Sequence, residues 1–222
     1  MSTKRGKKGD ILLEMKDIRI DGFSDERWHK IIRGIDLTLH RGEVMGLIGE
    51  SGAGKSTLGL ASMGFTKPGC KITSGSVVFD GKDLVTASED EKRSLWGTRI
   101  AYVAQSAAAS FNPAHRLLNQ TVEASLNQNL QSRDLAEADA RNLYKQLQLP
   151  DPENIGDRYP HQVSGGQLQR MMTAMAMSPR PDLIIFDEPT TALDVTTQVE
   201  VLVAMRAIVE KFNTAALYIT HD

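Results

Sequence analysis

The chain has 222 residues, of which 41% are hydrophobic and 24% are charged, and its formal net charge is −2. This length suffices for one domain with a large core, and the balanced charge gives no basic field of the kind that draws a protein to nucleic acid. The lone Cys70 excludes an intrachain disulfide and favours a reducing compartment, and no apolar run approaches the roughly 20 residues that cross a bilayer.

The predicted elements begin after a basic tail. Residues 1–9 carry four cations and are not followed by an apolar segment of signal-peptide character, so we expect a flexible tail there and a folded domain over 10–222. Apolar residues among charged neighbours predict a strand over 11–20, and alternation of apolar and polar residues predicts a half-buried strand over 31–40. The polar residues 21–30 between them are expected to form a loop.

Short apolar runs predict the remaining strands, at 44–48, 77–79, 100–103, 182–187 and 215–220. The pair Asp80-Gly81, which follows the second of these runs, predicts a turn. Strands that alternate with helices predict an α/β fold around a mainly parallel sheet.

Helical patterns fill the stretch from about 106 to 178 and return near the C-terminus. Helices are expected at 132–149, 167–177 and 195–211. The first has an apolar stripe through Leu135, Ala138, Leu143 and Leu147, and the second carries a methionine cluster that we expect to pack in the core.

The most informative motif lies between the strand at 44–48 and a helical run at 58–63. It matches G-x-x-x-x-G-K-[ST], the phosphate-binding P-loop, and the strand–loop–helix context disfavours the alternative of a glycine-rich turn without a ligand. Its glycines allow the backbone N–H groups to approach phosphate oxygens, while Lys55 reaches the β- and γ-phosphates and the Ser56 hydroxyl coordinates Mg²⁺. The motif consists of Gly49, Glu50, Ser51, Gly52, Ala53, Gly54, Lys55, Ser56 and Thr57.

Two carboxylates end the apolar strand at 182–187. Asp187 is placed to hold Mg²⁺ beside a P-loop. Glu188 points to the other side of the strand and is a candidate to polarise a water for attack on the γ-phosphate. The alternative is that Asp-Glu-Pro merely ends a strand, and the presence of a P-loop favours the functional interpretation.

A second glycine pair opens the helix at 167–177 and offers a second anion site. Residues 163–167, Val-Ser-Gly-Gly-Gln, resemble the LSGGQ signature of ATP-binding-cassette (ABC) ATPases, with Val163 in place of the usual Leu. The other marks of that family follow in the family's order. Gln105 resembles the Q-loop glutamine, 192–194 resembles the D-loop, and His221 resembles the switch histidine.

This resemblance implies a P-loop NTPase core with a mainly parallel sheet, an antiparallel β subdomain and an α-helical signature subdomain. It implies ATP and Mg²⁺ as cofactors, with each ATP held between the P-loop of one domain and the signature of a partner. The implied catalytic residues are Glu188, His221 and Gln105, and the implied metal ligands are Ser56, Gln105 and Asp187.

The implied contacts with the partner's nucleotide or with the dimer interface come from Ser164, Gly165, Gly166, Gln167 and Asp194. The family also stacks an upstream aromatic residue on adenine. Trp28 is the candidate for that role, and the alternative is an ordinary half-buried aromatic.

Three further stretches resemble the oligopeptide, dipeptide and nickel importers within this family: residues 106–120, 158–162 and 188–196. The resemblance implies an ATPase that powers solute import from the cytoplasmic face of the inner membrane, bound peripherally. Its partners would be a second ATPase subunit, in a homodimer or a heterodimer, together with permease subunits that contact 106–120. An external solute-binding protein would be an indirect partner, and no nucleic acid is expected.

The chain stops at Asp222, whereas relatives continue with further strands and a helix. We therefore expect the usual C-terminal strands to be lacking and the isolated chain to have weak ATPase activity. Two alternatives are a soluble ABC ATPase of DNA repair, chromosome structure or translation, and a catalytically inactive regulatory cassette. The absence of visible coiled coils or zinc-binding insertions disfavours the first, and intact Lys55, Asp187 and Glu188 disfavour the second.

Overall fold

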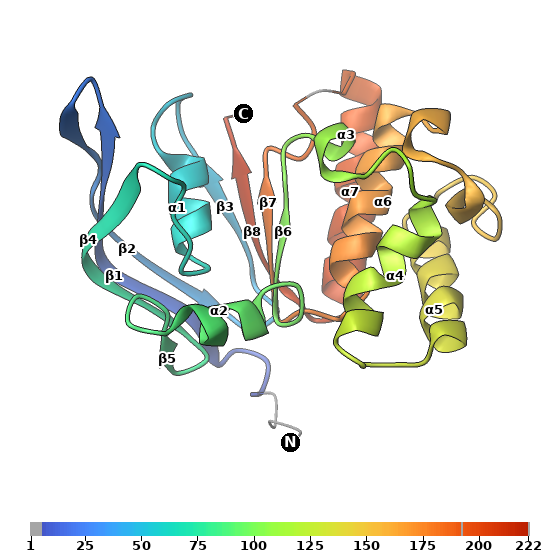
Figure 1. Cartoon of the computed structure of the whole chain (residues 1–222), viewed down its shortest axis with the longest axis horizontal. Helices are drawn as coiled ribbons and strands as arrows, with labels where there is room; N and C mark the ends of the chain where they lie inside the picture. Colours follow the sequence, from blue (N-terminus) through green and yellow to red (C-terminus); the bar gives the residue numbers. More distant parts are fainter. Residues whose placement is uncertain (1–5, 192, 222) are drawn as a thin grey trace. The chain divides into compact units, whose positions relative to one another are not determined.

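The structure is a computed structural model that describes residues 6–191 and 193–221. Residues 1–5 of the expected tail, Ala192 of the D-loop motif and the terminal Asp222 lie outside the described residues. The chain divides into two compact units (Figure 1). The first is formed by Met1–Trp96 with Ala215–Asp222, and the second by Gly97–Thr214.

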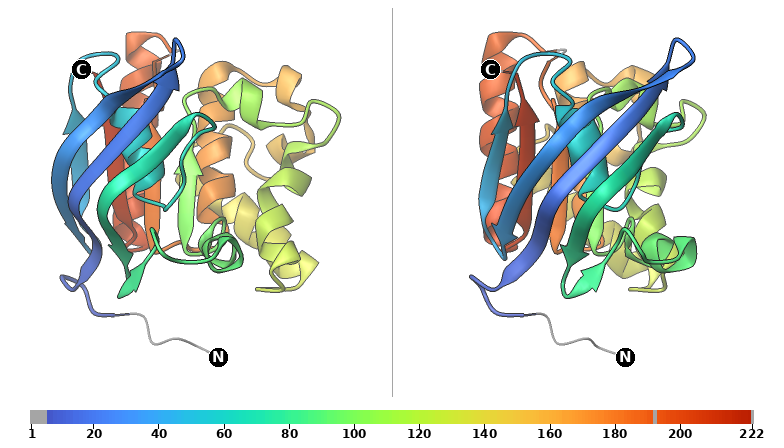
Figure 2. Two further views of the ribbon diagram at one scale, coloured as in Figure 1. Left: turned by 60° about the vertical axis from the view of Figure 1, so that its left-hand side comes forward. Right: turned by 90° about the vertical axis from the view of Figure 1, so that its left-hand side faces the viewer.

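An antiparallel sheet with the strand order β2-β1-β4-β5 dominates the first unit (Figure 2). Leu13 of β1 pairs with Leu39 of β2 and Phe79 of β4, and all three side chains are buried, so one face of the sheet forms a hydrophobic core. Asp80 and Gly81 both have positive φ between β4 and β5, which confirms the predicted turn. The strands are β1 (Ile11–Ser24), β2 (Arg27–His40), β4 (Cys70–Phe79) and β5 (Lys82–Asp83).

The loop predicted over 21–30 is wrong, because most of that segment belongs to the β1–β2 hairpin. Ser24 pairs with Arg27, and the two residues between them, Asp25 and Glu26, have φ values of 48° and 59°. Positive φ at both central residues is the conformation of a two-residue hairpin turn. The loop was predicted because the segment is polar, but exposed positions of a β-strand also carry polar side chains. Hydrogen bonds between β1 and β2 keep the segment extended.

A parallel strand pair completes the sheet structure of the first unit. β3 (Val44–Ile48) runs beside β8 (Ala215–Thr220), with Ile48 opposite Thr220. Helix α1 (Lys55–Ala61) follows β3 and lies against β8. The predicted bounds of β3 and β8 are confirmed, and both strands lead directly into candidate site residues at their carboxyl ends.

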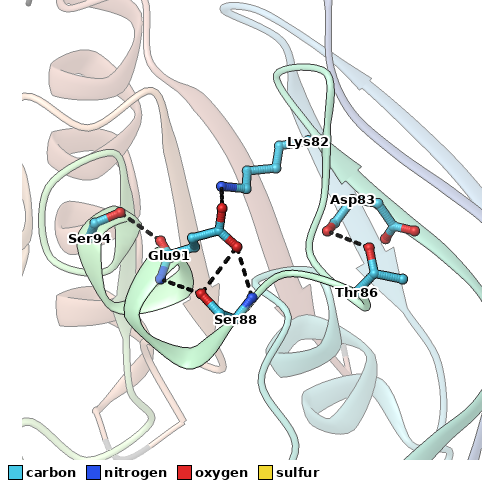
Figure 3. A network of polar contacts seen from close by, with 6 residues as sticks. All are labelled: Lys82, Asp83, Thr86, Ser88, Glu91 and Ser94. Atoms are coloured by element: carbon cyan, nitrogen blue, oxygen red, sulfur yellow. Dashed lines mark hydrogen bonds and ion pairs between the residues drawn. The ribbon is translucent and has the colours of Figure 1, made fainter.

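Helix α2 (Glu89–Leu95), which was not predicted, begins with a capping box (Figure 3). The Ser88 hydroxyl accepts a hydrogen bond from the Glu91 backbone N–H at 3.3 Å, and the Glu91 carboxylate accepts from the Ser88 N–H at 2.9 Å. Lys82 donates to the same carboxylate at 2.5 Å. The bond from Lys82, followed by those from Ser88, lowers the pKa of Glu91 to about 2.

Glu91→Gln is expected to lower the unfolding temperature at pH 7, and the difference from the unmodified chain should shrink as pH falls from 4.5, the ordinary pKa of the group, toward 2. The sign follows because a carboxylate with a depressed folded pKa contributes stability above its unfolded pKa and loses it on protonation. Thermal unfolding between pH 7 and pH 2 measures this. Asp90→Asn, in the same helical turn, is the control, and an equal deficit at pH 7 and pH 2 would contradict the prediction.

The second unit combines a parallel strand pair with helices. β6 (Ile100–Val103) pairs with β7 (Leu183–Asp187), with Val103 opposite Phe186. Every residue of β7 is buried, as expected for a strand covered on both faces. The helices are α3 (Ala107–Ser110), α4 (Leu117–Asn127), α5 (Arg133–Gln146), α6 (Gly165–Met177) and α7 (Val195–Lys211), with two 3-10 turns at Ile155–Asp157 and Pro160–Gln162.

Helix α6 is central to this unit, because it contacts α3, α4, α5, α7 and β6 (Figure 1). Met171, Met172 and Met177 on α6 are buried, which confirms the predicted core role of the methionine cluster. The apolar stripe predicted for α5 is partly wrong. Leu135 is 62% exposed, and the buried stripe instead runs through Ala136, Ala140, Leu143, Tyr144 and Leu147. Helix α5 contacts both α4 and α6, which accounts for a buried stripe on this face.

Candidate nucleotide-binding site

The P-loop joins β3 to α1 and exposes its backbone. Gly52 and Gly54 have φ values of 81° and 85°, which only glycine adopts without strain. Residues 50–53 at the tip of the loop are exposed. The Lys55 side chain is 8% exposed, and its ammonium donates to the carbonyl oxygens of Gly49 at 2.7 Å and Glu50 at 2.8 Å. The cation is therefore held against the backbone of the loop by two carbonyl oxygens.

Gly54→Ala is expected to destabilise the fold more than Gly52→Ala. Both substitutions place an L residue in the left-handed region, at a cost of about 1–2 kcal/mol. A Cβ at Gly54 would also lie 2.8 Å from Ile32 Cδ1 and 2.9 Å from Ile31 Cγ2, whereas a Cβ at Gly52 would meet nothing within 4 Å. Overpacking adds about 1–3 kcal/mol. Urea unfolding of the two variants measures the difference, and equal midpoints would contradict this steric explanation.

His221 leaves the same sheet edge as the P-loop. Because Ile48 is the partner of Thr220 in the parallel pair, the next residues, Gly49 and His221, both follow the carboxyl ends of adjacent strands. Both belong to the first unit. The structure thus brings one expected γ-phosphate contact to the edge from which the P-loop begins.

The carboxylates at the end of β7 have different surroundings. Asp187 is 6% exposed, and the Tyr102 hydroxyl donates to its Oδ2 atom at 2.5 Å. Burial, and then the interaction with Asp187, raises the pKa of the Tyr102 phenol above its ordinary value. Sequence reasoning missed Tyr102, because only the register of β6 against β7 places its ring on the same sheet face as Asp187.

Glu188 lies just beyond β7, in contact with the Q-loop glutamine. Gln105 Nε2 donates to its Oε2 atom at 3.3 Å, and the Thr191 hydroxyl donates to the same atom at 3.2 Å. The backbone at Glu188 has a φ of 48°, which is uncommon for a residue other than glycine. Two hydrogen bonds and an unusual backbone therefore orient this carboxylate at the strand end, where it is only half buried.

The signature residues begin helix α6. Ser164 is the N-cap: its hydroxyl accepts from the Gln167 N–H at 3.3 Å, while Gln167 Oε1 accepts from the Ser164 N–H at 3.0 Å. Ser164 and Gly165 are exposed, whereas Gly166 is buried. A Cβ at Gly166 would lie 2.5 Å from Thr197 Cγ2 of α7. Gly166 thus has a packing role that the sequence did not reveal, and Ser164 and Gly165 are the accessible part of the motif.

Asp194 is the N-cap of α7. Its carboxylate accepts from the Thr197 backbone N–H at 3.1 Å and from the Thr197 hydroxyl at 2.7 Å. These bonds, led by that from the hydroxyl, lower the pKa of Asp194. The side chain is exposed to solvent while it caps the helix.

Trp28 lies near the turn of the β1–β2 hairpin and is 47% exposed. Its ring packs against Phe23, with 5.3 Å between ring centroids, and Lys71 Nζ lies 3.8 Å from the ring centroid. Ile31 and Ile32 on the same strand approach Gly54 of the P-loop. An exposed ring on a strand that passes the P-loop is compatible with stacking on a base, and the role stays a prediction.

The side chains expected to bind the metal are all oxygen ligands, which Mg²⁺ prefers. Among residues 6–191 and 193–221, no cluster of three or more His, Cys, Asp or Glu side chains is placed to hold a metal. The ligands expected from the sequence are one carboxylate, Asp187, and the Gln105 amide of the second unit, with the Ser56 hydroxyl of the first, and their assembly around one ion stays a prediction. This composition fits a cation that keeps several waters and binds mainly through one or two carboxylates and substrate phosphates.

A phosphate-binding loop after a parallel strand, with paired carboxylates after another, defines the class of P-loop NTPases. The ABC transporter family matches residues 32–191, and the chain belongs to that family. The predicted fold class is confirmed by likeness to solved structures. A dimeric ATP-binding cassette in a post-hydrolysis state, bound to ADP and Pi, has a TM-score of 0.82 at 24% identity, covering 95% of this chain and 88% of that one.

A second solved structure, from Clostridium perfringens and part of an ABC transporter complex, has a TM-score of 0.76 at 23% identity, covering 96% of this chain and 79% of that one. At these identities the likeness shows a shared fold. In the part of the chain that the structure describes, no helix combines the length and hydrophobicity that a membrane span requires.

Curated relatives are transport ATP-binding proteins. A probable peptide ABC transporter ATP-binding protein of Sinorhizobium fredii is 36% identical over 100% of this chain and 67% of its own length. An oligopeptide transport ATP-binding protein of Lactococcus lactis is 36% identical over 97% and 64%, respectively. A dipeptide transport ATP-binding protein of Escherichia coli is 40% identical over 90% and 62%. The chain thus spans about two thirds or less of these relatives.

Proposed function

We propose that this chain is the ATP-binding and ATP-hydrolysing subunit of an importer for peptides or a related solute such as nickel. The observation that carries the nucleotide part is the exposed P-loop with the Lys55 ammonium held over its carbonyls. The resemblance to oligopeptide and dipeptide transport ATP-binding proteins supports the transport part and disfavours a role in DNA repair or translation.

The chain's own residues supply binding and proton transfer. Loop N–H groups and Lys55 bind the β- and γ-phosphates. Glu188 takes a proton from a water whose oxygen attacks the γ-phosphorus, while the bond from that phosphorus to the β-bridging oxygen breaks and ADP leaves. Gln105 orients Glu188 through its 3.3 Å hydrogen bond. His221 contacts the γ-phosphate from the end of β8.

Ser56, Asp187 and Gln105 would hold Mg²⁺, which supplies neutralisation of the phosphate charge when bound. The carboxylate of Asp187 is buried, and its Oδ2 atom accepts a hydrogen bond from the Tyr102 hydroxyl. The nucleotide's remaining wall would come from a second subunit, through Ser164, Gly165, Gly166, Gln167 and Asp194. The exposure of Ser164, Gly165 and Asp194 supports this role.

Residues 106–120 are proposed to contact permease subunits. The Gln120 side chain stabilises the conformation of this segment through three hydrogen bonds. Its Nε2 atom donates to the carbonyl oxygens of Asn112 and His115, and its Oε1 atom accepts from the Asn112 N–H. A polar groove of about 310 Å³ lies here, lined by Asn112, His115, Asn119, Gln120 and Glu123. Such docking would hold the subunit peripherally at the cytoplasmic face of the inner membrane, beneath a permease fed by an external solute-binding protein.

Phosphate release from ATP by the purified chain tests the enzymatic part. Since the proposed site is shared between two chains, the rate per chain should rise with protein concentration, and it should require Mg²⁺. Absence of both ATP binding and phosphate release in a folded sample would contradict the proposal. For the transport part, co-purification with permease subunits from cells that produce the chain is expected, and association with DNA or ribosomes instead would contradict it.

A further inference from the structure

We propose that Tyr102 is a positioning residue that holds the carboxylate of Asp187 in the orientation in which it binds Mg²⁺. This inference rests on the proposed function, since Asp187 is a metal ligand only if the chain binds Mg²⁺ with ATP. It assigns a function to a side chain that belongs to none of the sequence motifs.

The strand register brings the two residues together. Tyr102 is opposite Ile185 in the parallel β6–β7 pair, and Asp187 lies two residues beyond Ile185. Because side chains alternate between the faces of a sheet, Asp187 and Ile185 point to the same face as Tyr102. The tyrosine ring spans the diagonal from one strand to the next, and its hydroxyl reaches Asp187 Oδ2 at 2.5 Å.

Burial of Asp187 makes this hydrogen bond important for keeping the carboxylate charged. Asp187 is 6% exposed, and the four residues of β7 before it are fully buried and apolar. A carboxylate removed from water needs hydrogen-bond donors to stay ionised, and a bond from an O–H group to a carboxylate is among the strong ones. The phenol therefore stabilises the charged form and restricts rotation of the carboxyl group. A rigid β-strand on each side fixes both partners.

Donors that hold a metal-binding carboxylate tune metal affinity, and their removal typically costs about 10–100-fold in affinity or activity. Tyr102→Phe removes the hydroxyl while keeping the ring. We expect the Mg²⁺ concentration for half-maximal ATP hydrolysis to rise about 10–100-fold at saturating ATP. The affinity for ATP in EDTA should remain within about twofold of the unmodified chain, because the P-loop contacts are untouched.

Tyr144→Phe is the matched control. The Tyr144 hydroxyl makes a 2.6 Å hydrogen bond with the Thr121 hydroxyl between α5 and α4, and its ring is fully buried. Both variants thus lose a short hydrogen bond in the same unit. If Tyr102 only stabilises the fold, the two variants should behave alike.

A second readout is independent of turnover. With a non-hydrolysable ATP analogue, addition of Mg²⁺ should raise the unfolding temperature of the unmodified chain and of Tyr144→Phe. Tyr102→Phe should keep the rise caused by the analogue alone and lose most of the additional rise caused by Mg²⁺. An unchanged Mg²⁺ requirement and an unchanged Mg²⁺-dependent rise in Tyr102→Phe would overturn the inference. Failure of the unmodified chain both to bind and to hydrolyse ATP would instead contradict the proposed function.

Discussion

Glu188→Gln is expected to lower the rate of ATP hydrolysis about 10²–10⁴-fold while ATP stays bound, because a general base of this kind contributes a factor of that size. The amide is isosteric with the carboxylate, and its oxygen still accepts the hydrogen bonds from Gln105 and Thr191. The phosphate contacts of the P-loop are unchanged. With hydrolysis blocked, the ATP-bound pair of chains should accumulate.

Two measurements check this prediction: phosphate release under saturating ATP, and light scattering with and without ATP. Glu153→Gln, an exposed carboxylate on the same unit, is the control and should leave both unchanged. Hydrolysis by Glu188→Gln at the unmodified rate would show that another group takes the proton from water.

Lys55→Ala is expected to weaken ATP binding about 10–100-fold, since a hydrogen bond to a charged group contributes about 1.5–3 kcal/mol and each 1.4 kcal/mol is about tenfold in affinity. The substitution removes the cation that the structure holds over the loop. It also leaves the carbonyl oxygens of Gly49 and Glu50 without this donor.

Fluorescence titration with a labelled ATP analogue measures the affinity, and thermal unfolding without nucleotide shows whether the loop change alone destabilises the fold. Lys67→Ala, which removes an exposed cation of the same unit, is the control. Equal affinities of the Lys55 and Lys67 variants would remove Lys55 from the phosphate site.

The sequence predicted well the parts of the fold that depend on local pattern. The bounds of β3, β6, α7 and β8 agree with the structure, because each is a short apolar run or a long periodic one. The 21–30 segment was missed because its structure depends on pairing between strands. Likewise, whether Leu135 or Ala136 faces the core depends on where α4 packs against α5.

In the candidate site, too, local sequence pattern predicts some residues, whereas others depend on contacts between elements. The spacing of the P-loop motif points to Lys55, and the place of Asp187 and Glu188 at the end of an apolar strand points to those two carboxylates. Tyr102 has no such signature, since its contact with Asp187 is set by the register of two parallel strands. The packing role of Gly166 against Thr197 of α7 could not be predicted from the sequence. In the sequence, a glycine that contacts a ligand cannot be distinguished from one that packs against a helix.

Mixing two inactive variants tests the shared ATP site most directly. Lys55→Ala keeps an intact signature and Ser164→Arg keeps an intact P-loop, so neither variant forms a complete site with its own copies. A mixed pair contains one complete site. At equal concentrations, phosphate release should reach about a quarter of the unmodified rate, because random pairing makes half of the dimers mixed and each mixed dimer has one intact site. A mixture that stays at the background rate of the separate variants, beside an active unmodified chain, would contradict a site built from two chains.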